Sequence, residues 1–300
     1  MPQQSKSQVL PVIALLYTAT LWGLFWYPLR LLEDAGLHGI WSTFLIYVAT
    51  LPLAVFFTVR YWKDLSKRPV LLFLIAVANG VCNVAFILAV LDGVVVRVLL
   101  LFYLSPLWAV LLSVVILRER ISRVSILTLI VAMVGAIIML WDPATGTPWP
   151  TSHADWFALL SGFTFAVSNV LVRKAQNISV QIKTASTWLG VVMVAGILVI
   201  TEQLPIPDIA GEVYLGAFML GAVGVVTMTI AVQYGVTNLP VQRSAVILMF
   251  ELVAGVVSSQ WLTNEVVSNI EWIGGILIMT AAWFAATQRN ERCLAELDDK

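Results

Sequence analysis

The sequence predicts an all-α polytopic membrane protein whose ten transmembrane helices form two inverted five-helix repeats. Three observations lead to this fold class: the composition, the spacing of apolar segments and a weak internal repeat. Of the 300 residues, 60% are hydrophobic and 11% are charged, which is roughly half the charge of an ordinary soluble domain. We therefore expect lipid, rather than water, to be the main solvent of this chain.

The charges balance, with 17 Lys plus Arg against 17 Asp plus Glu. A balanced chain offers neither a nucleic-acid-binding surface nor a polybasic patch, so we expect no nucleic-acid partner. Cys82 and Cys293 lie far apart in an apolar run and a charged tail, without metal-ligand spacing. We expect no metal and no cofactor.

Apolar segments long enough to cross a bilayer follow one another along the whole chain. A helix needs about 20 apolar residues to span the hydrocarbon core. Charged residues and Pro- or Gly-containing breaks divide the chain into ten such segments: 9–31, 40–59, 70–91, 94–117, 122–140, 156–173, 181–201, 213–235, 240–262 and 268–287. The first of them is too long for a cleavable signal peptide, so we expect it to remain as a span.

Cationic residues gather in alternate connections. The N-terminal tail, the tail after the last segment and the connections after segments two, four and six hold 14 of the 17 Lys and Arg residues, and the opposite connections are acidic. The positive-inside rule then predicts that both termini are cytoplasmic in a bacterial inner (plasma) membrane.

The chain also resembles itself at a shift of 146 residues. This shift pairs Arg97 with Arg243 and Glu119 with Glu265. We interpret residues 1–145 and 146–300 as two five-helix repeats. Because five is odd, the second repeat enters the membrane from the opposite side, an arrangement that recurs among secondary transporters.

Three stretches carry a resemblance to a known family: LWGLFW at Leu21–Trp26, LSPLWAVLLSVVILRER at Leu104–Arg120 and LMFELVAGVVSSQWLTNE at Leu248–Glu265. They resemble the EamA-type ten-helix branch of the drug/metabolite transporter superfamily, and within it the aromatic amino acid exporters. The resemblance implies a central cavity, alternating access and export. It also implies a proline-assisted bend in each half: Pro106 keeps it in the first half, whereas in the second half Leu252 follows Glu251 where the family usually has proline, so the bend there stays open.

Four aromatic residues are candidates for the wall of a binding cavity. Trp22 and Trp26 lie four residues apart and so share one helix face, where two indoles can flank a flat substrate. Trp188 and Tyr103 also lie at bilayer depth. Helix packing explains all four equally well.

Three uncharged polar residues at bilayer depth, Asn83, Ser105 and Asn169, can hydrogen-bond a zwitterionic substrate. Each can equally bond a neighbouring helix, because interhelical polar contacts are common in membrane bundles. Only their convergence in space would favour a site.

Three charged residues fall inside predicted spans. Glu251 lies about ten residues into its segment, where an acid is by default a functional candidate. Glu251 can couple transport to protons, or its protonated carboxyl group can serve only to hydrogen-bond a neighbouring helix. Arg97 and Arg243 are candidates for a gate or for a contact to a substrate carboxylate, and both can instead reach the headgroups.

These observations favour a secondary transporter, and the resemblance adds export of small metabolites such as aromatic or neutral amino acids. The expected partners are a small-molecule substrate and the lipid bilayer, with proton coupling open. We do not expect an enzyme, because Glu251 stands alone and both His38 and His153 fall in predicted external loops. An intramembrane enzyme, an uncoupled channel, and a carrier of another metabolite or drug are the alternatives.

Overall fold

The computed structural model describes residues 9–37, 39–93, 95–119, 121–140, 150, 152–262 and 269–287, and every regular element in these ranges is helical. In the first half the elements are α1 (Val9–Asp34), α2 (Gly39–Val48), α3 (Leu51–Arg60), α4 (Trp62–Leu65), α5 (Pro69–Asp92), α6 (Val95–Phe102), α7 (Ser105–Leu112), the π-helix η1 (Ser113–Leu117) and α8 (Arg123–Leu140). In the second half they are α9 (His153–Lys174), α10 (Val180–Thr201), α11 (Gly211–Met219), the π-helix η3 (Leu220–Val225), α12 (Val226–Asn238), α13 (Val241–Leu248), α14 (Phe250–Leu262) and α15 (Asn269–Thr287).

Each predicted segment coincides with a helix, or with an interrupted helix, to within three residues at either end. In the described residues, eight helical stretches are long and apolar enough to cross a membrane, and the pair α2 and α3, bent by 42°, makes up to nine. The apolar part of α15, Trp272–Thr287, is shorter. The all-helical, multi-pass architecture is thus confirmed, and the count of ten spans stays a prediction.

Apolar side chains cover much of the outside of the bundle. Val115, Ile200 and Trp283 each expose 70% or more of their surface, which in a water-soluble protein would be unusual. Exposed tryptophans at the ends of predicted spans, where indoles favour the headgroup layer, are Trp62, Trp156, Trp261 and Trp272. The surface therefore suits a bilayer.

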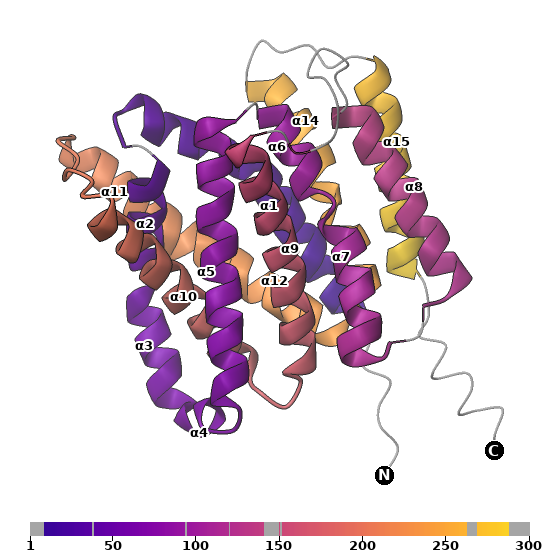
Figure 1. Cartoon of the computed structure of the whole chain (residues 1–300), viewed down its shortest axis with the longest axis horizontal. Coiled ribbons are helices and arrows are strands. Elements are labelled where there is room, and N and C mark those ends of the chain that lie inside the picture. Colours follow the sequence, from indigo (N-terminus) through magenta and orange to yellow (C-terminus); the bar gives the residue numbers. More distant parts are fainter. Residues whose placement is uncertain are drawn as a thin grey trace.

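The helices form one bundle in which the two halves interlock. Helix α5 packs against α9 and α10, α1 packs against α12 and α14, and α9 packs against α6 and α7. Helices α8 and α15 lie side by side along one edge of the bundle, while α2, α3 and α11 form the opposite edge (Figure 1). Most interhelical contacts thus cross between the halves.

Glycine allows two of these helices to touch through their backbones. A Cβ on Gly190 of α10 would overlap the carbonyl oxygen of Ala76 on α5. Small residues at such crossings let membrane helices approach closely enough for van der Waals packing to hold them.

We expect Gly190→Ala to lower the free energy of unfolding by about 1–3 kcal/mol, because the added methyl group must push α5 and α10 apart. Thermal unfolding of the detergent-solubilised protein measures this loss. Gly211→Ala is the matched control, since a Cβ at Gly211 meets nothing within 4 Å. Equal effects of the two substitutions would contradict the proposed role of the crossing.

Candidate functional site

Besides the bent pair α2 and α3, two of the membrane-crossing stretches are interrupted by a turn, one in each half. Helix α6 ends at Phe102 and α7 begins at Ser105, while α13 ends at Leu248 and α14 begins at Phe250. Tight turns bridge both breaks: Leu104 N donates to Leu101 O at 3.3 Å, and Met249 N donates to Val246 O at 3.2 Å. Each break thus replaces the helical hydrogen-bond pattern by a bond to the third preceding residue.

Proline accounts for the first break. Pro106 lies in the first turn of α7, where its missing N–H is tolerated. The same missing N–H leaves the carbonyl of Phe102 without its helical donor, so α6 cannot run on through Pro106.

The second break forms without a proline, since none occurs in 241–262. Leu252 N donates to Met249 O at 3.1 Å and begins the next helix. The resemblance implied a proline-assisted bend that the missing proline left open, and the structure shows a break that forms without proline. Nothing in the local sequence explains why α13 ends at Leu248.

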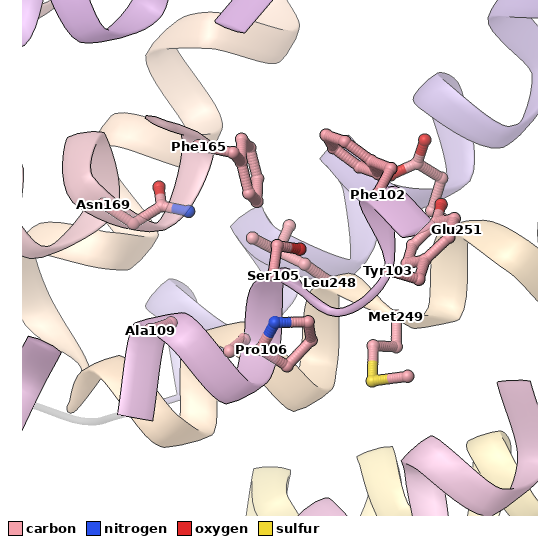
Figure 2. Close-up of a pocket in the computed structure, with 11 residues that line it drawn as sticks. Phe102, Tyr103, Ser105, Pro106, Ala109, Phe165, Asn169, Leu248, Met249 and Glu251 are labelled. Carbon is pink, nitrogen blue, oxygen red and sulfur yellow. The ribbon is translucent and has the colours of Figure 1, made fainter. Parts of the chain in front are cut away.

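A pocket lies between the two breaks (Figure 2). Its lining comes from the two broken stretches and from α9: Phe102, Tyr103, Ser105, Pro106, Ala109, Phe165, Asn169, Ala245, Leu248, Met249 and Glu251. The cavity volume is about 20 Å³, which is room for about one water molecule. The structure therefore shows this site almost closed.

The polar groups of the pocket come from different helices. The phenol ring of Tyr103 lies beside the carboxyl group of Glu251, close enough to interact with it (Figure 2). Ser105 and the amide of Asn169 have no hydrogen-bond partner for their side chains among the described residues. These two side chains are free to bond a ligand.

Glu251 is the one charged residue in the lining. Within the described part of the chain, no Lys, Arg or His forms an ion pair with it. A carboxylate in hydrocarbon needs a proton or a cation. The pocket can therefore bind a proton or a positively charged group.

Five predicted residues thus meet in one pocket: Tyr103, Ser105, Pro106, Asn169 and Glu251. Two lining residues that the sequence did not reveal are Phe102 and Phe165. Phe165 precedes Asn169 by four residues and so shares its helix face, a spacing that would have identified it.

The other predicted residues lie outside the lining. Trp22 stands behind the pocket, with its ring 6.2 Å from that of Phe165 in an edge-on arrangement. Trp26 donates through Nε1 to Ser258 Oγ at 2.9 Å. Asn83 accepts a hydrogen bond from Tyr47 at 3.2 Å and donates to Asn79 O at 3.0 Å.

Neither Trp188 nor Arg243 lines the pocket. Trp188 is fully buried in a separate apolar cluster and stacks on Phe57 with 6.1 Å between ring centres. Arg243 donates to the carbonyl oxygens of Ala285 and Ala286 at the end of α15, at 2.6 and 2.8 Å. The side chain of Arg97, the remaining candidate, lies outside the described part of the structure.

A second cavity of about 200 Å³ borders the same Tyr103. Its lining is otherwise made of apolar side chains from α6, α8 and the turn after α6: Leu100, Leu101, Leu104, Met133, Ala136, Ile137 and Leu140. Tyr103 thus lines both the pocket that contains Glu251 and this larger apolar space.

Comparison with known proteins agrees with this architecture. The sequence matches the model of the EamA-like transporter family over residues 9–141 and 152–287. It is 26% identical over 243 residues to an uncharacterized transporter of Archaeoglobus fulgidus, covering 80% of this chain and 82% of the relative. It is 24% identical over 245 residues to the uncharacterized transporter YojE of Bacillus subtilis, covering 77% and 79%.

One solved crystal structure shares the fold, with a TM-score of 0.74 and 18% identity over 93% of this chain and 96% of the other. Because the family model spans nearly all of the described helices, the chain belongs to the EamA-like transporter family and is a multi-pass membrane transporter of the drug/metabolite transporter superfamily.

Proposed function

We propose that the protein is a secondary transporter that exports aromatic or neutral amino acids by alternating access, and that the pocket between the two helix breaks binds the substrate. The observation that carries this proposal is the convergence of both breaks on one cavity that contains Glu251. Transporters of several folds bind their substrates where discontinuous helices meet near the bilayer midplane.

The pocket offers a partner to each part of such a substrate. Glu251 suits the ammonium group, and the unpaired side chains of Ser105 and Asn169 suit the carboxylate. The rings of Phe102 and Phe165, whose centres are 5.6 Å apart, offer an aromatic surface against which the ring of the substrate would pack once the pocket opens (Figure 2). Offset aromatic pairs contribute about 0.5–1.5 kcal/mol beyond the burial of apolar area.

The small volume of the pocket supports a cycle between two states. A cavity of about 20 Å³ cannot hold an amino acid, so the substrate must enter a more open form. Rotation of Tyr103 would add the neighbouring apolar space of about 200 Å³. The described form then corresponds to a closed form of the carrier.

The packing of the helices supports a repeat of residues 1–145 and 146–300, and the odd number of predicted spans in each half argues that the repeat is inverted. We number the predicted spans from one to ten and exchange each span with the one five positions away. The contact of α1 with α13 and α14 then becomes the contact of α9 with α6 and α7, and the structure contains both. In the same way, the contact of α1 with α12 becomes the contact of α5 with α9. The contact between α8 and α15 becomes itself. Both termini in the cytoplasm of a bacterial inner membrane complete the proposed topology, on the basis of the cation bias.

A second candidate substrate is an aromatic amine without a carboxylate. The observation that favours it is the charge of the lining, which contains Glu251 and no cationic side chain. An amino acid brings a second carboxylate close to Glu251, whereas an amine brings only the ammonium group that Glu251 can pair.

The purified protein in liposomes tests both candidates. We expect saturable uptake and counterflow of radiolabelled phenylalanine, with phenethylamine as the competing candidate and threonine as the small comparison substrate. If the protein transports phenethylamine but not phenylalanine, the substrate is an aromatic amine rather than an amino acid. Flux without saturation or counterflow would identify a channel, and absence of flux with chemical turnover of a substrate would identify an enzyme.

Glu251→Gln should abolish the response of transport to a pH gradient, because glutamine cannot exchange a proton with the cavity. The measurement is phenylalanine flux with and without an imposed gradient. Glu212→Gln, at an exposed position of α11, is the control that removes an acid elsewhere. If the Glu251→Gln protein keeps a gradient-dependent flux, Glu251 does not couple transport to protons.

Phe165→Ala should raise the half-saturation concentration for phenylalanine by about two- to tenfold, which corresponds to the loss of one aromatic pair. It should change threonine transport much less. Trp188→Ala removes an indole from the separate buried cluster, so its effect should be the same for both substrates. If Trp188→Ala impairs transport of phenylalanine more than transport of threonine, Trp188 belongs to the binding site.

A further inference from the structure

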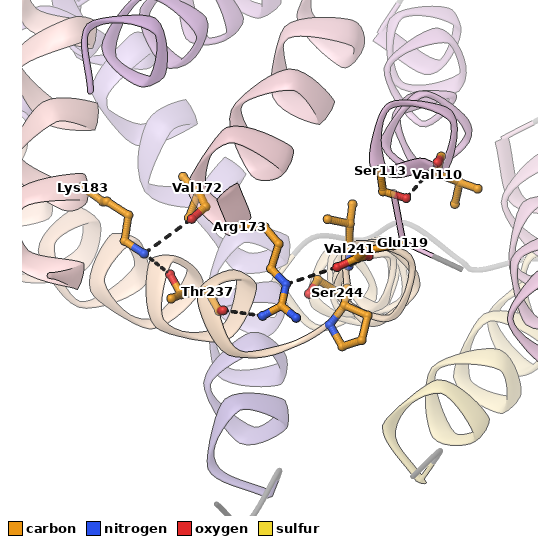
Figure 3. A network of polar contacts seen from close by, with 10 residues as sticks. Val110, Ser113, Glu119, Val172, Arg173, Lys183, Thr237, Val241 and Ser244 are labelled. Atoms are coloured by element: carbon orange, nitrogen blue, oxygen red, sulfur yellow. Dashed lines mark hydrogen bonds and ion pairs between the residues drawn. The ribbon is translucent and has the colours of Figure 1, made fainter. Parts of the chain in front are cut away.

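A network of charged and polar side chains joins the two halves of the bundle at one end (Figure 3). Arg173, at the end of α9, donates to Glu119 Oε1 at 3.3 Å and to the carbonyl oxygen of Thr237 at 2.6 Å. Glu119 Oε2 in turn accepts from Val241 N at 3.2 Å, at the start of α13. Lys183 of α10 donates to the Thr237 hydroxyl and to the carbonyl oxygen of Val172.

The network is largely shielded from solvent. The side chains of Arg173 and Glu119 are 15% and 11% exposed, and Lys183 is fully buried. Charge-assisted bonds of this kind are stronger than bonds between neutral groups, and more so away from water. Separating these elements therefore requires breaking several strong contacts together.

The network lies one helical turn from the pocket on two different helices. Asn169 of the pocket precedes Arg173 by four residues on α9, and Ala245 of the pocket follows Val241 by four residues on α13. Residues four apart share a helix face and are separated by about one turn. A displacement of α9 or α13 that breaks their bonds to Glu119 thus also moves a wall of the pocket.

Glu119 reaches its partners because the chain turns sharply after η1. Arg118 adopts the left-handed conformation, with φ 55° and ψ 34°, which is sterically unfavourable for a residue with a Cβ. The turn brings the Glu119 carboxylate to the backbone N–H at the start of α13, where a negative charge is favourable. The first half of the chain is thereby attached to the second.

We propose that Glu119 and Arg173 form a latch that closes this end of the pocket, and that substrate passes at this end only when the latch opens. The inference rests on the proposed alternating access, and the proposed topology places the latch on the cytoplasmic side. The latch consists of one cation, Arg173, and one carboxylate, Glu119, and Lys183 belongs to the network around it. Removing the charge of Glu119 removes its ion pair with Arg173 and weakens the bond that it accepts from Val241 N, which favours the open form.

Accessibility of a pocket cysteine tests the latch without any substrate. Cys82 and Cys293 are replaced by Ser, and Ala109→Cys places a thiol in the pocket lining. The rate of reaction with a membrane-impermeant maleimide is then measured separately from each side of sealed membrane vesicles. Labelling depends on the open population of the protein and not on transport, so a failure of the proposed substrate does not affect this readout.

We expect Glu119→Gln to raise the labelling rate at least fivefold from the latch side and not from the other side. Lys67→Gln is the matched control, because Lys67 pairs with Asp64 in a more exposed ion pair outside the network; it should leave the rate unchanged. An unchanged rate in the Glu119→Gln protein, or an equal rise from both sides, overturns the proposal.

Arg173→Lys provides a second variant that keeps the charge. A lysine ammonium group cannot reproduce the planar donors with which Arg173 bonds both Glu119 and Thr237. We expect a smaller one-sided rise in labelling for this variant. If Glu119→Gln does not yield folded protein, an unchanged rate in the Arg173→Lys protein is sufficient to reject the latch.

Discussion

The absence of water in the hydrocarbon core determines where this bundle can be irregular. A backbone N–H or C=O without a partner costs several kcal/mol there, so a spanning helix can break only inside protein or beside a cavity. Pro106 has no N–H that could donate to the carbonyl of Phe102. This carbonyl oxygen lies against Gly162 of α9, where an added Cβ would come within 2.6 Å of it. The breaks in the two halves face the same pocket, so the constraint that shelters them also creates the candidate site.

Hydrophobic length predicted the helices well, because charges or turn-forming residues bound each apolar segment. It could not predict the interruptions inside the segments. The break at Met249 has no proline, and the bend between α2 and α3 begins at Ala49, ahead of Pro52. Such interruptions depend on what the neighbouring helices supply to the freed backbone groups, and a single sequence does not contain that information.

Only some of the residues that line the candidate site could be predicted, because residue type does not reveal which polar side chains already have a partner on a neighbouring helix. Asn83 and Trp26 have hydrogen-bond partners on neighbouring helices, whereas Ser105 and Asn169 have none among the described residues and face the pocket. Nothing in the residue types separates these two groups. Tryptophan away from the interface is equally ambiguous, since Trp188 finds its neighbours in Phe57 and the apolar side chains around it.

The connections between helices that the structure describes are short, so we expect the spanning helices themselves to control access to the pocket. Helices α9 and α13 each contribute a residue to the polar network, Arg173 and Val241, and a residue to the pocket one turn away, Asn169 and Ala245. A helix transmits displacement along its axis because its hydrogen bonds fix one turn to the next. Opening the latch and enlarging the pocket would then be one movement, which links access to the site with the shape of the site.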